Sequence, residues 1–460
     1  MSEAATLPAE LPQVIPLARA REARTPLSIG AIREVLRMSS ADEARTPLRP
    51  IETVSVVGLG YIGLPTAAVA SSRGISVVGV DVNAHVVDTL NSGKIHIAEP
   101  DLDELVSTAV QDGKLRAVVK PEPADVFVIA VPTPFAEGHK PDLSYVKAAA
   151  VSIAPVLKSG DLVILESTSP VGTTGDLCRW LAEARSDLTF PDEHSEAADI
   201  RIAYCPERVL PGRVLRELVE NARVIGGVSA ACTRRAVEFY RIFVRGDCIS
   251  TDARTAELVK LTENAFRDVN IAFANELSLV CDKVGVNVWE LIRLANQHPR
   301  VNILQPGPGV GGHCIAVDPW FIVHSAPELA RLIRCAREVN DGKPEWVVHQ
   351  VLEQAKNFPS PRIACFGLAF KADIDDLRES PALEVVHALA KTLAGKITVV
   401  EPFVNELPMG LRGKVRLSQT TAALAEADIV VGLVDHAAFR RIDRLLLEGK
   451  AVIDTRGIWR

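Results

Sequence analysis

The sequence predicts an α/β protein with two Rossmann-like, doubly wound domains joined by a central domain built on a long helix. Three observations lead to this fold class. Short apolar strands alternate with helical stretches up to about residue 250, the pattern of a parallel sheet covered on both faces. One helical period then spans residues 251–282. A second series of short apolar strands begins at Arg362.

The 460 residues are enough for two or three domains. We expect an extension at residues 1–50, a first α/β domain at 51–250, a central helical domain at 251–345 and a second α/β domain at 346–460. The extension is rich in Ala, Arg, Glu and Pro and contains the hexapeptide EARTPL twice. It cannot bury enough apolar surface to order alone, so we expect it to be disordered.

The elements follow in order. Strands of the first domain are expected at residues 54–57, 76–80, 126–131 and 162–165. The long helix keeps its apolar period from Leu258 to Leu279, and Thr251 or Asp252 can cap its start. A shorter helix is expected at residues 288–296, and the strands of the last domain at 363–366, 397–400, 429–434 and 451–453. The central region is a candidate homodimer interface.

Composition excludes several classes of protein. A formal net charge of -7 argues against a nucleic-acid binder, which needs basic residues to neutralise phosphates. The apolar runs are too short to enter a membrane, and the first residues do not resemble a secretion signal, so we expect a cytoplasmic protein. The eight cysteines are scattered without metal-ligand spacing, which predicts free thiols and no metal site.

A glycine turn predicts a dinucleotide site. Gly58, Gly60 and Gly63 follow a strand and open a helix; they allow a tight turn, close approach of a pyrophosphate and helix packing, respectively. Asp81 ends the next strand, where its carboxylate can bind a ribose hydroxyl. The same negative charge would repel a 2′-phosphate, so NAD is favoured over NADP.

Two further loops follow strands at the edge where doubly wound sheets bind ligands. Thr133 lies in the first, and Thr168 and Thr174 lie in the second. Their hydroxyls can line the dinucleotide, although ordinary turn chemistry explains them equally well.

A candidate chemical site begins on the long helix. Lys260, Asn264 and Arg267 share one face by their i, i+4, i+7 spacing, a pattern that also occurs on plain solvated helices. Four glycines then precede Cys314, and Asp318 follows it. Because this glycine density lets backbone wrap a ligand, Cys314 is a candidate nucleophile, and a nearby lysine would favour its thiolate.

These residues together resemble the UDP-glucose/GDP-mannose dehydrogenase family over residues 53–460. The resemblance rests on blocks in the family's order: VVGLGYIGLP, VPTP, ESTSPVGTT, YCPER, ELVKLTENAFRDVNIAFANE, GPGVGGHCIAVDP and GLAFKADIDDLRESP. It implies an N-terminal NAD-binding domain, a central dimerisation domain that carries the catalytic loop, and a C-terminal UDP-binding domain. The second α/β domain keeps only Gly367 of a nucleotide fingerprint, which suits UDP.

The resemblance also implies a mechanism. Two hydride transfers from sugar C6 to NAD would pass through a thiohemiacetal and a thioester on Cys314, and water would release a carboxylate. It assigns catalytic roles to Cys314, Lys260, Asn264, Asp318 and Glu207. With the turn and loops above, the predicted cofactor-binding residues are Gly58, Gly60, Tyr61, Ile62, Gly63, Asp81, Thr133, Thr168, Thr174 and Arg378. The predicted substrate-binding residues are Arg208, Val209, Lys260, Asn264, Arg267, His298, Arg300, Gly311, Phe370 and Lys371.

Within the family, residues 204–212 and 298–306 are most similar to members that oxidise UDP-N-acetyl-D-mannosamine, for surface polysaccharide precursors. UDP-glucose dehydrogenases usually carry an aromatic residue where this chain has Arg208, and a second acid near Pro211. This departure weakens a glucose assignment and leaves open which group activates the hydrolytic water. UDP-glucose and UDP-N-acetylglucosamine remain alternative substrates.

Two other classes of protein fit part of this sequence. A β-hydroxyacid dehydrogenase shares the NAD domain and a helical Lys/Asn pair, but it needs neither Cys314 nor a C-terminal α/β domain. A non-catalytic UDP-sugar-binding protein would be expected to have lost Cys314 or Lys260, and both are present.

Overall fold

The computed structural model describes residues 49–97, 99–210, 212–312, 314–393 and 395–459. Residues 51–460 form one compact unit. The expectation of a disordered extension falls almost wholly outside the described residues. The domain boundaries at about 250 and 345 stay predictions.

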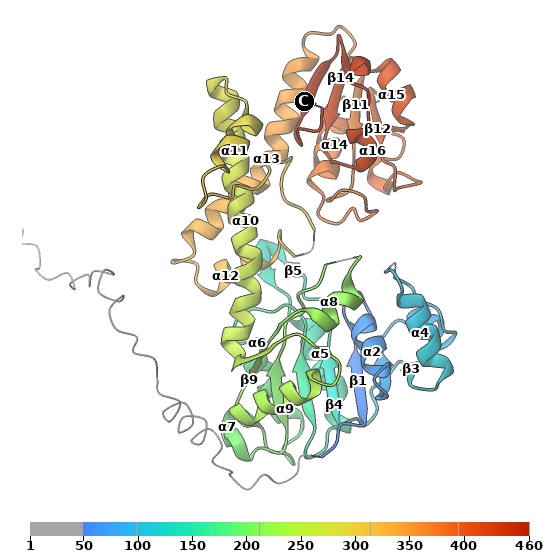
Figure 1. Ribbon diagram of the computed structural model, residues 1–460, viewed down its shortest axis with the longest axis vertical. Coiled ribbons are helices and arrows are strands. Elements are labelled where there is room, and N and C mark those ends of the chain that lie inside the picture. The colour runs from blue at the N-terminus through green and yellow to red at the C-terminus, as the bar shows by residue number, and fades with distance from the viewer. Residues whose placement is uncertain (1–48, 98, 211, 313, 394, 460) are drawn as a thin grey trace, which may run out of the picture. The chain divides into compact units, whose positions relative to one another are not determined.

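The first sheet is built mostly of parallel strands, as the apolar runs predict (Figure 1). In the described residues its order is β10-β9-β8-β7-β4-β1-β2-β3. The strands are β1 (Thr53–Val57), β2 (Ser76–Val80), β3 (Leu115–Val118), β4 (Val126–Ile129), β7 (Leu162–Leu165), β8 (Arg201–Tyr204), β9 (Arg223–Gly227) and β10 (Cys248–Asp252). Every neighbouring pair is parallel except β8 and β9, which are antiparallel.

Helices cover both faces of this sheet, which gives it two separate apolar cores. They are α2 (Gly63–Ser71), α3 (Ala84–Asn91), α4 (Leu102–Gln111), α5 (Ser144–Ile153), α6 (Thr173–Ala184), α7 (Pro191–His194), α8 (Val214–Glu220) and α9 (Ala230–Tyr240). A short hairpin of β5 (Phe135–Ala136) and β6 (Lys140–Pro141) follows β4. The doubly wound architecture is therefore confirmed.

The predicted long helix is α10 (Ala253–Val284). Asp252 caps it by accepting a hydrogen bond from Thr255 N at 2.9 Å, and Gly285 ends it in the left-handed conformation. The shorter predicted helix is α11 (Val288–Ala295). Two helices that the sequence analysis did not place, α12 (Asp318–Ser325) and α13 (Arg331–Ala355), pack against α10 (Figure 1).

The last domain is a parallel sheet with order β13-β12-β11-β14-β15 in the described residues. Its strands are β11 (Ile363–Phe366), β12 (Ile397–Val400), β13 (Arg416–Leu417), β14 (Ile429–Gly432) and β15 (Ala451–Asp454). Strand β14 ends two residues earlier than expected. Helices α14 (Pro381–Thr392), α15 (Thr420–Glu426) and α16 (Ala437–Arg440) enclose two further apolar clusters with this sheet.

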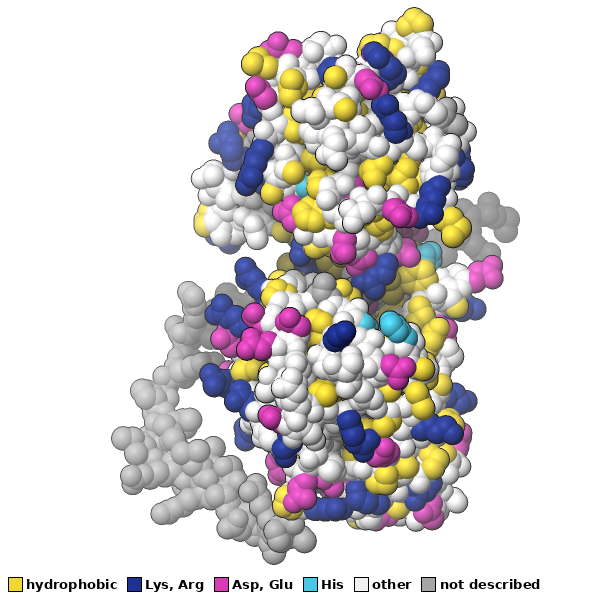
Figure 2. Space-filling view, turned by 90° about the vertical axis from the view of Figure 1, so that its right-hand side faces the viewer, with side chains coloured by type: hydrophobic (Ala, Val, Ile, Leu, Met, Phe, Trp, Pro, Cys, Tyr) yellow, Lys and Arg dark blue, Asp and Glu magenta, His cyan; other side chains and the backbone are white. Residues whose placement is uncertain are grey.

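The described surface shows two features that bear on partners. On the face in Figure 2, basic and acidic side chains are interspersed and do not form one broad basic area. Among the described residues, none of the helices combines the length and apolar character needed to cross a lipid bilayer.

Candidate active site

The glycine turn between β1 and α2 has the geometry that its sequence predicts. Gly58 has φ +93°, and a Cβ there would lie 2.6 Å from Ala130 O. A Cβ on Gly63 would lie 1.8 Å from Gly58 O, so only glycine permits this helix start. Gly60 lies between them with nothing within 4 Å of a Cβ position, which leaves its backbone open to a ligand.

Asp81 is fixed at the end of β2 beside this turn. Its Oδ2 accepts a hydrogen bond from Leu59 N at 3.1 Å, and its Oδ1 accepts one from Asn83 N at 2.9 Å. Tyr61 is exposed and Ile62 is half-buried at the opening of α2. Carboxylate, open glycine and helix N-terminus are thus together, and they fit the ribose and pyrophosphate of a dinucleotide.

The three threonines of the neighbouring loops differ in what they can reach. Thr133 Oγ1 donates to Thr168 O at 2.6 Å, so these two loops are joined, and both residues are half-buried. Thr174 is fully buried, and its Oγ1 donates to Glu257 Oε1 at 2.6 Å. Thr174 therefore anchors its loop to α10, and its contact with a cofactor stays a prediction.

The second α/β domain has a counterpart of Asp81 that is already engaged. Glu401 follows β12, and its Oε2 accepts hydrogen bonds from Leu368 N at 2.7 Å and Ala369 N at 3.2 Å. The same oxygen lies 3.2 Å from Nε2 of His436, which is fully buried. Because its carboxylate is buried under a histidine, Glu401 has no room for a ribose, in agreement with the missing glycines.

Cys314 lies directly before α12, and the helix start ties it to α10. The carbonyl of Cys314 accepts hydrogen bonds from Val317 N at 3.0 Å and Asp318 N at 2.8 Å. Asp318, the first residue of α12, accepts from Asn264 Nδ2 through its Oδ2 at 2.5 Å. The predicted helix face and the predicted cysteine loop therefore meet.

Lys260 lies among the acidic groups of this cluster. Burial raises the pKa values of Cys314, Asp318 and Glu207, and the positive charge of Lys260 opposes each rise. A fixed cation among a thiol and two carboxyls can stabilise an oxyanion that forms beside it.

Burial has the larger effect on the thiol itself. Burial, followed by the charge of Asp318, raises the pKa of Cys314 to about 11, against the opposing charges of Lys260, Arg378 and Arg267. The expectation of a lysine-stabilised thiolate is thus correct for the direction of the lysine effect and wrong for the net result. The pKa of Asp318 also rises, to about 6, because burial outweighs the hydrogen bond from Asn264 and the charge of Lys260.

Glu207 is close to Lys260 and pairs with Arg223, a residue that was not predicted for the site. Its Oε2 accepts a hydrogen bond from Val209 N at 2.7 Å, and its Oε1 lies 3.4 Å from Nη2 of buried Arg223. Burial raises the pKa of Glu207, and the charges of Arg223 and Lys260 oppose that rise. No local pattern marks Arg223, because only the antiparallel pairing of β9 brings it here.

Comparison with known proteins shows what this arrangement belongs to. Residues 52–244 match the NAD binding domain of the UDP-glucose/GDP-mannose dehydrogenase family. Residues 254–342 match its central domain, and residues 364–460 match its UDP binding domain. The chain belongs to this family. It is a nucleotide-sugar dehydrogenase with an NAD-binding domain.

Curated relatives carry two different names. The chain is 65% identical over 407 residues to an NDP-N-acetyl-D-galactosaminuronic acid dehydrogenase of Ralstonia nicotianae, a match that covers 88% of this chain and 96% of the relative. It is 62% and 60% identical to the UDP-N-acetyl-D-mannosamine dehydrogenases of Yersinia pestis and Escherichia coli, which cover 89% of this chain and 99% of each relative.

Solved structures agree on the fold. The UDP-D-ManNAc dehydrogenase of Pyrococcus horikoshii has a TM-score of 0.79 and 40% identity, over 89% of this chain and 96% of its own. The UDP-N-acetyl-mannosamine dehydrogenase Cap5O of Staphylococcus aureus has a TM-score of 0.78 and 42% identity, over 88% of this chain and 95% of its own.

In this family member the glycine loop before Cys314 packs tightly on the C-terminal domain. A Cβ on Gly311 would lie 2.4 Å from Glu379 O and 2.8 Å from Phe370 Cβ. Gly312 has φ +85°, and its Cβ would lie 2.9 Å from the Phe370 ring. The loop therefore needs glycine to reach Phe370, and it places the predicted substrate residues Gly311 and Phe370 in contact.

The basic residues predicted to bind cofactor or substrate differ in their contacts and exposure. Arg378 forms a bidentate pair with Asp376 at 2.6–3.1 Å, and its charge still acts on Cys314. Arg267 is exposed and also acts on Cys314. Lys371 is exposed in the loop after Phe370.

Arg208, predicted to bind the sugar, is paired within the protein, and its contact with a substrate stays a prediction. Its Nε lies 3.0 Å from Glu263 Oε2, its Nη2 lies 2.5 Å from Glu263 Oε1, and its Nη1 donates to Ala222 O at 3.2 Å. The guanidinium is therefore engaged on α10, while neighbouring Val209 is half-buried and uses its N–H to orient Glu207.

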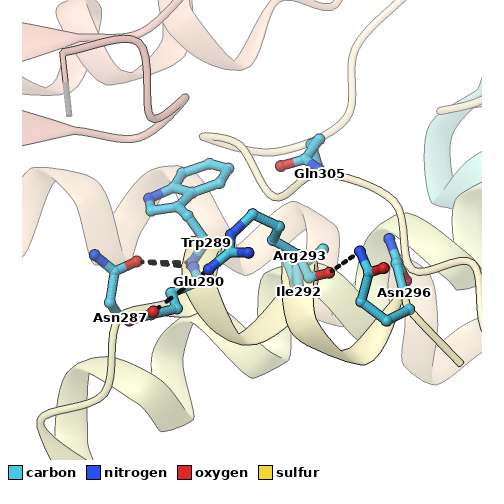
Figure 3. Close-up of a pocket in the computed structure, with 8 residues that line it drawn as sticks. Asn287, Trp289, Glu290, Ile292, Arg293, Asn296 and Gln305 are labelled. Carbon is cyan, nitrogen blue, oxygen red and sulfur yellow. Dashed lines mark hydrogen bonds and ion pairs between the residues drawn. The ribbon is translucent and has the colours of Figure 1, made fainter.

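His298 and Arg300 lie in the exposed turn after α11. Arg300 N donates to His298 Nδ1 at 3.3 Å. The turn adjoins a hollow of about 610 Å³ lined by Asn287, Trp289, Glu290, Ile292, Arg293, Asn296, Gln297 and Gln305. Figure 3 shows Trp289 and Arg293 rising from α11 toward Gln305 of the next loop.

Proposed function

We propose that this protein oxidises UDP-N-acetyl-D-mannosamine at C6 to UDP-N-acetyl-D-mannosaminuronate with two equivalents of NAD. The observation that carries the proposal is the cluster of Cys314, Lys260, Asn264 and Asp318 in a chain whose first domain matches an NAD-binding domain and whose last matches a UDP-binding domain.

The glycine turn and Asp81 would hold NAD, which supplies the hydride acceptor for both oxidations. Lys260 stabilises the developing alkoxide on the C6 oxygen. Cys314 attacks the aldehyde carbon through Sγ, and the resulting thiohemiacetal keeps the sugar attached for the second oxidation. Water then attacks the thioester carbon, the carbon–sulfur bond breaks, and a carboxylate and a free thiol result.

A proton must leave that water. Glu207 is close enough to Lys260 for that charge to act on its carboxylate, and Val209 N donates a hydrogen bond to it. We therefore assign Glu207 the role of base. The overall reaction consumes one alcohol, two NAD and one water, and it yields one carboxylate, two NADH and three protons.

The N-acetylated sugar is supported by the relatives, because those at 60–65% identity bear names of dehydrogenases for N-acetylated hexosamine derivatives. The pairing of Arg208 with Glu263 means that Arg208, a predicted substrate-binding residue, would have to leave that partner to bind the sugar. The 65% identity to proteins named for N-acetyl-D-galactosaminuronic acid makes the corresponding galactosamine sugar a second candidate substrate.

We further propose a homodimer formed through α10. Phe266 is 68% exposed, Phe273 51% and Val280 49%, and their spacing of seven residues places them on one face of the helix. Such an apolar stripe on a 32-residue helix is a surface that a second copy of the helix can cover. We place the enzyme in the cytoplasm, in the supply of precursors for surface polysaccharides.

One experiment tests the activity. The purified protein is mixed with NAD and, separately, with the UDP derivatives of N-acetylmannosamine, N-acetylgalactosamine, N-acetylglucosamine and glucose, and NADH and the uronate are measured together. We expect the highest kcat/KM with the mannosamine sugar and two NADH for each uronate. A higher kcat/KM with the galactosamine sugar would select the second candidate, and no NADH with any sugar would refute the proposed function.

A further inference from the structure

A cluster of buried polar side chains lies behind the proposed active site, at the ends of β7 and β8. Glu166 directly follows β7 and is 2% exposed, and Glu207, three residues after β8, is 6% exposed. Arg223 opens β9 and is 2% exposed, and Tyr240, which ends α9, is fully buried. Apart from Glu207, the mechanism above uses none of them.

The antiparallel pairing of β8 and β9 explains how Arg223 reaches this place. The register pairs Ala203 with Gly227 and Tyr204 with Gly226. Continued along both chains, the same register sets Glu207 opposite Arg223, and their side chains do lie 3.4 Å apart. A parallel β9 would begin at the other edge of the sheet, so this one reversed strand brings a cation to the catalytic edge.

Arg223 also faces the second carboxyl group. Its guanidinium lies over the ring of Tyr240, 5.5 Å from the ring centre. The hydroxyl of Tyr240 donates to Glu166 Oε1 at 2.7 Å, and Thr66 Oγ1 lies 3.4 Å from Glu166 Oε2. The charge of Arg223 thus acts on both Glu166 and Glu207. Among the described residues, Nε and Nη1 of Arg223 have no hydrogen-bond partner.

Two buried carboxylates beside one cation do not both ionise readily. Burial raises the pKa of Glu166 to about 7, with Arg223 opposing the rise and Glu207 adding to it. Glu207 has a second cation, because Lys260 lowers its pKa as Arg223 does, and among carboxylates Glu217 raises it. The proton is therefore better placed on Glu166 than on Glu207.

We propose that Arg223 is a positioning residue for thioester hydrolysis, which keeps Glu207 ionised and aimed at the attacking water while Glu166 keeps a proton. The inference rests on the proposed function, since it requires an acyl group on Cys314. In the step that it serves, Glu207 takes one proton from water, oxygen bonds to C6, and the carbon–sulfur bond breaks. The second proton of that water ends on the departing sulfur, which gives the free thiol. Glu207 then releases the proton to solvent.

The test separates the oxidations from the hydrolysis. Each variant is mixed rapidly with NAD and the preferred UDP-sugar, NADH is followed from the first turnover, and the acyl adduct on Cys314 is measured by intact-protein mass. For Arg223→Met we expect a burst of two NADH for each site, an accumulating adduct and a steady-state kcat lower by about 100-fold. The acid limb of its kcat–pH profile should move to higher pH, because Glu207 has lost a cation.

Two variants sharpen the result. Arg223→Lys keeps a positive charge and should restore much of the hydrolysis rate. Glu166→Gln imitates the protonated acid and should keep kcat within about threefold, whereas a loss comparable to that of Arg223→Met would overturn the assignment of the proton to Glu166.

A matched control removes another buried guanidinium. Arg235 on α9 is 4% exposed and pairs with Glu238 at 3.1 Å, so Arg235→Met reports the structural cost without moving the pH limb. If Arg223→Met shows no burst of NADH and the acid limb of its kcat–pH profile does not shift, Arg223 has only a structural role. If Arg223→Met does not fold, Arg223→Gln takes its place, and an unshifted limb in that variant refutes the proposal. A wild-type enzyme that makes no NADH with any of the UDP-sugars would refute the proposed function instead.

Discussion

Asn264 Nδ2 donates a hydrogen bond to Asp318 Oδ2 at 2.5 Å, and this contact joins the long helix α10 to the start of α12. The hydrogen bond lowers the pKa of a carboxyl that burial raises to about 6. Without it, Asp318 would retain its proton to a higher pH. The contact therefore adjusts the charge beside Lys260 and Cys314 as well as fixing the catalytic loop.

A pH profile tests that relationship. Asn264→Ala should move the acid limb of kcat/KM upward, because the pKa of Asp318 rises when the hydrogen bond is lost. The matched control is Asn270→Ala, since Asn270 lies on the same helix, is partly exposed and donates to Phe266 O. If the acid limb of the kcat/KM profile of Asn264→Ala stays at its wild-type pH, the ionisation of Asp318 does not govern that limb.

The raised pKa of Asp318 also predicts how the stability of the folded protein changes with pH. The folded-state pKa of Asp318 lies above the ordinary 3.8, so the folded state favours the protonated acid. The stability contributed by this group is present below pH 3.8 and is lost as pH rises to about 6. Asp318→Asn, which imitates the neutral acid, should therefore raise the melting temperature at pH 7 relative to wild type while it lowers activity.

Cys314 provides a direct test of covalent catalysis. Cys314→Ala should abolish uronate formation and leave UDP-sugar affinity nearly unchanged, because only the covalent step is lost; at most an aldehyde should appear. Cys335→Ala, which removes an exposed thiol, is the control and should behave like wild type. Product analysis by mass spectrometry decides, and normal uronate from Cys314→Ala would refute the nucleophile.

Asp81 should determine the choice between NAD and NADP. Asp81→Asn removes the charge that repels a 2′-phosphate while it keeps an acceptor for Leu59 N, so the ratio of kcat/KM values should narrow by about tenfold or more. Asp88→Asn, an exposed neighbour on α3, should leave the ratio unchanged. Equal use of both cofactors by the wild-type enzyme would contradict this assignment.

The proposed dimer is tested through the apolar stripe of α10. Phe273→Glu places a charge in the middle of the stripe and should shift the protein to the monomer mass in light scattering. Asp282→Ala, on the opposite face of the same helix, is the control. A Phe273→Glu protein that stays dimeric would place the interface elsewhere.

Local sequence predicted the parts of this site that depend on local geometry. Gly63 cannot carry a side chain because its Cβ would meet Gly58 O in the same turn, and the cap of α10 follows from Asp252 alone. Glu207 was predicted from a resemblance, but its partner was not, because Arg223 arrives through a strand pairing that no periodicity reveals. The burial of Cys314 was also not predicted. The nearby lysine led us to expect a lowered thiol pKa, whereas burial raises it.

The pairing of Arg208 with Glu263 changes how substrate preference should be tested. If the guanidinium binds the acetamido group, it must turn away from Glu263, a half-exposed pair that contributes at most about 1 kcal/mol after solvent screening. Glu263→Gln should then keep or improve KM for the N-acetylated sugar. Arg208→Ala should raise that KM by roughly 5- to 150-fold, the equivalent of about 1–3 kcal/mol for a lost hydrogen-bonded contact.

The opposite pattern has an equally clear meaning. Arg208 adjoins Glu207 in the chain and bonds to Ala222 O, the residue before Arg223. If Arg208 instead acts by fixing residues 207–208 against residues 222–223, then Arg208→Ala and Glu263→Gln should both lower kcat and leave KM nearly unchanged. The double variant decides: additive effects indicate separate contacts, and a double variant no worse than either single one indicates that the pair works as a unit.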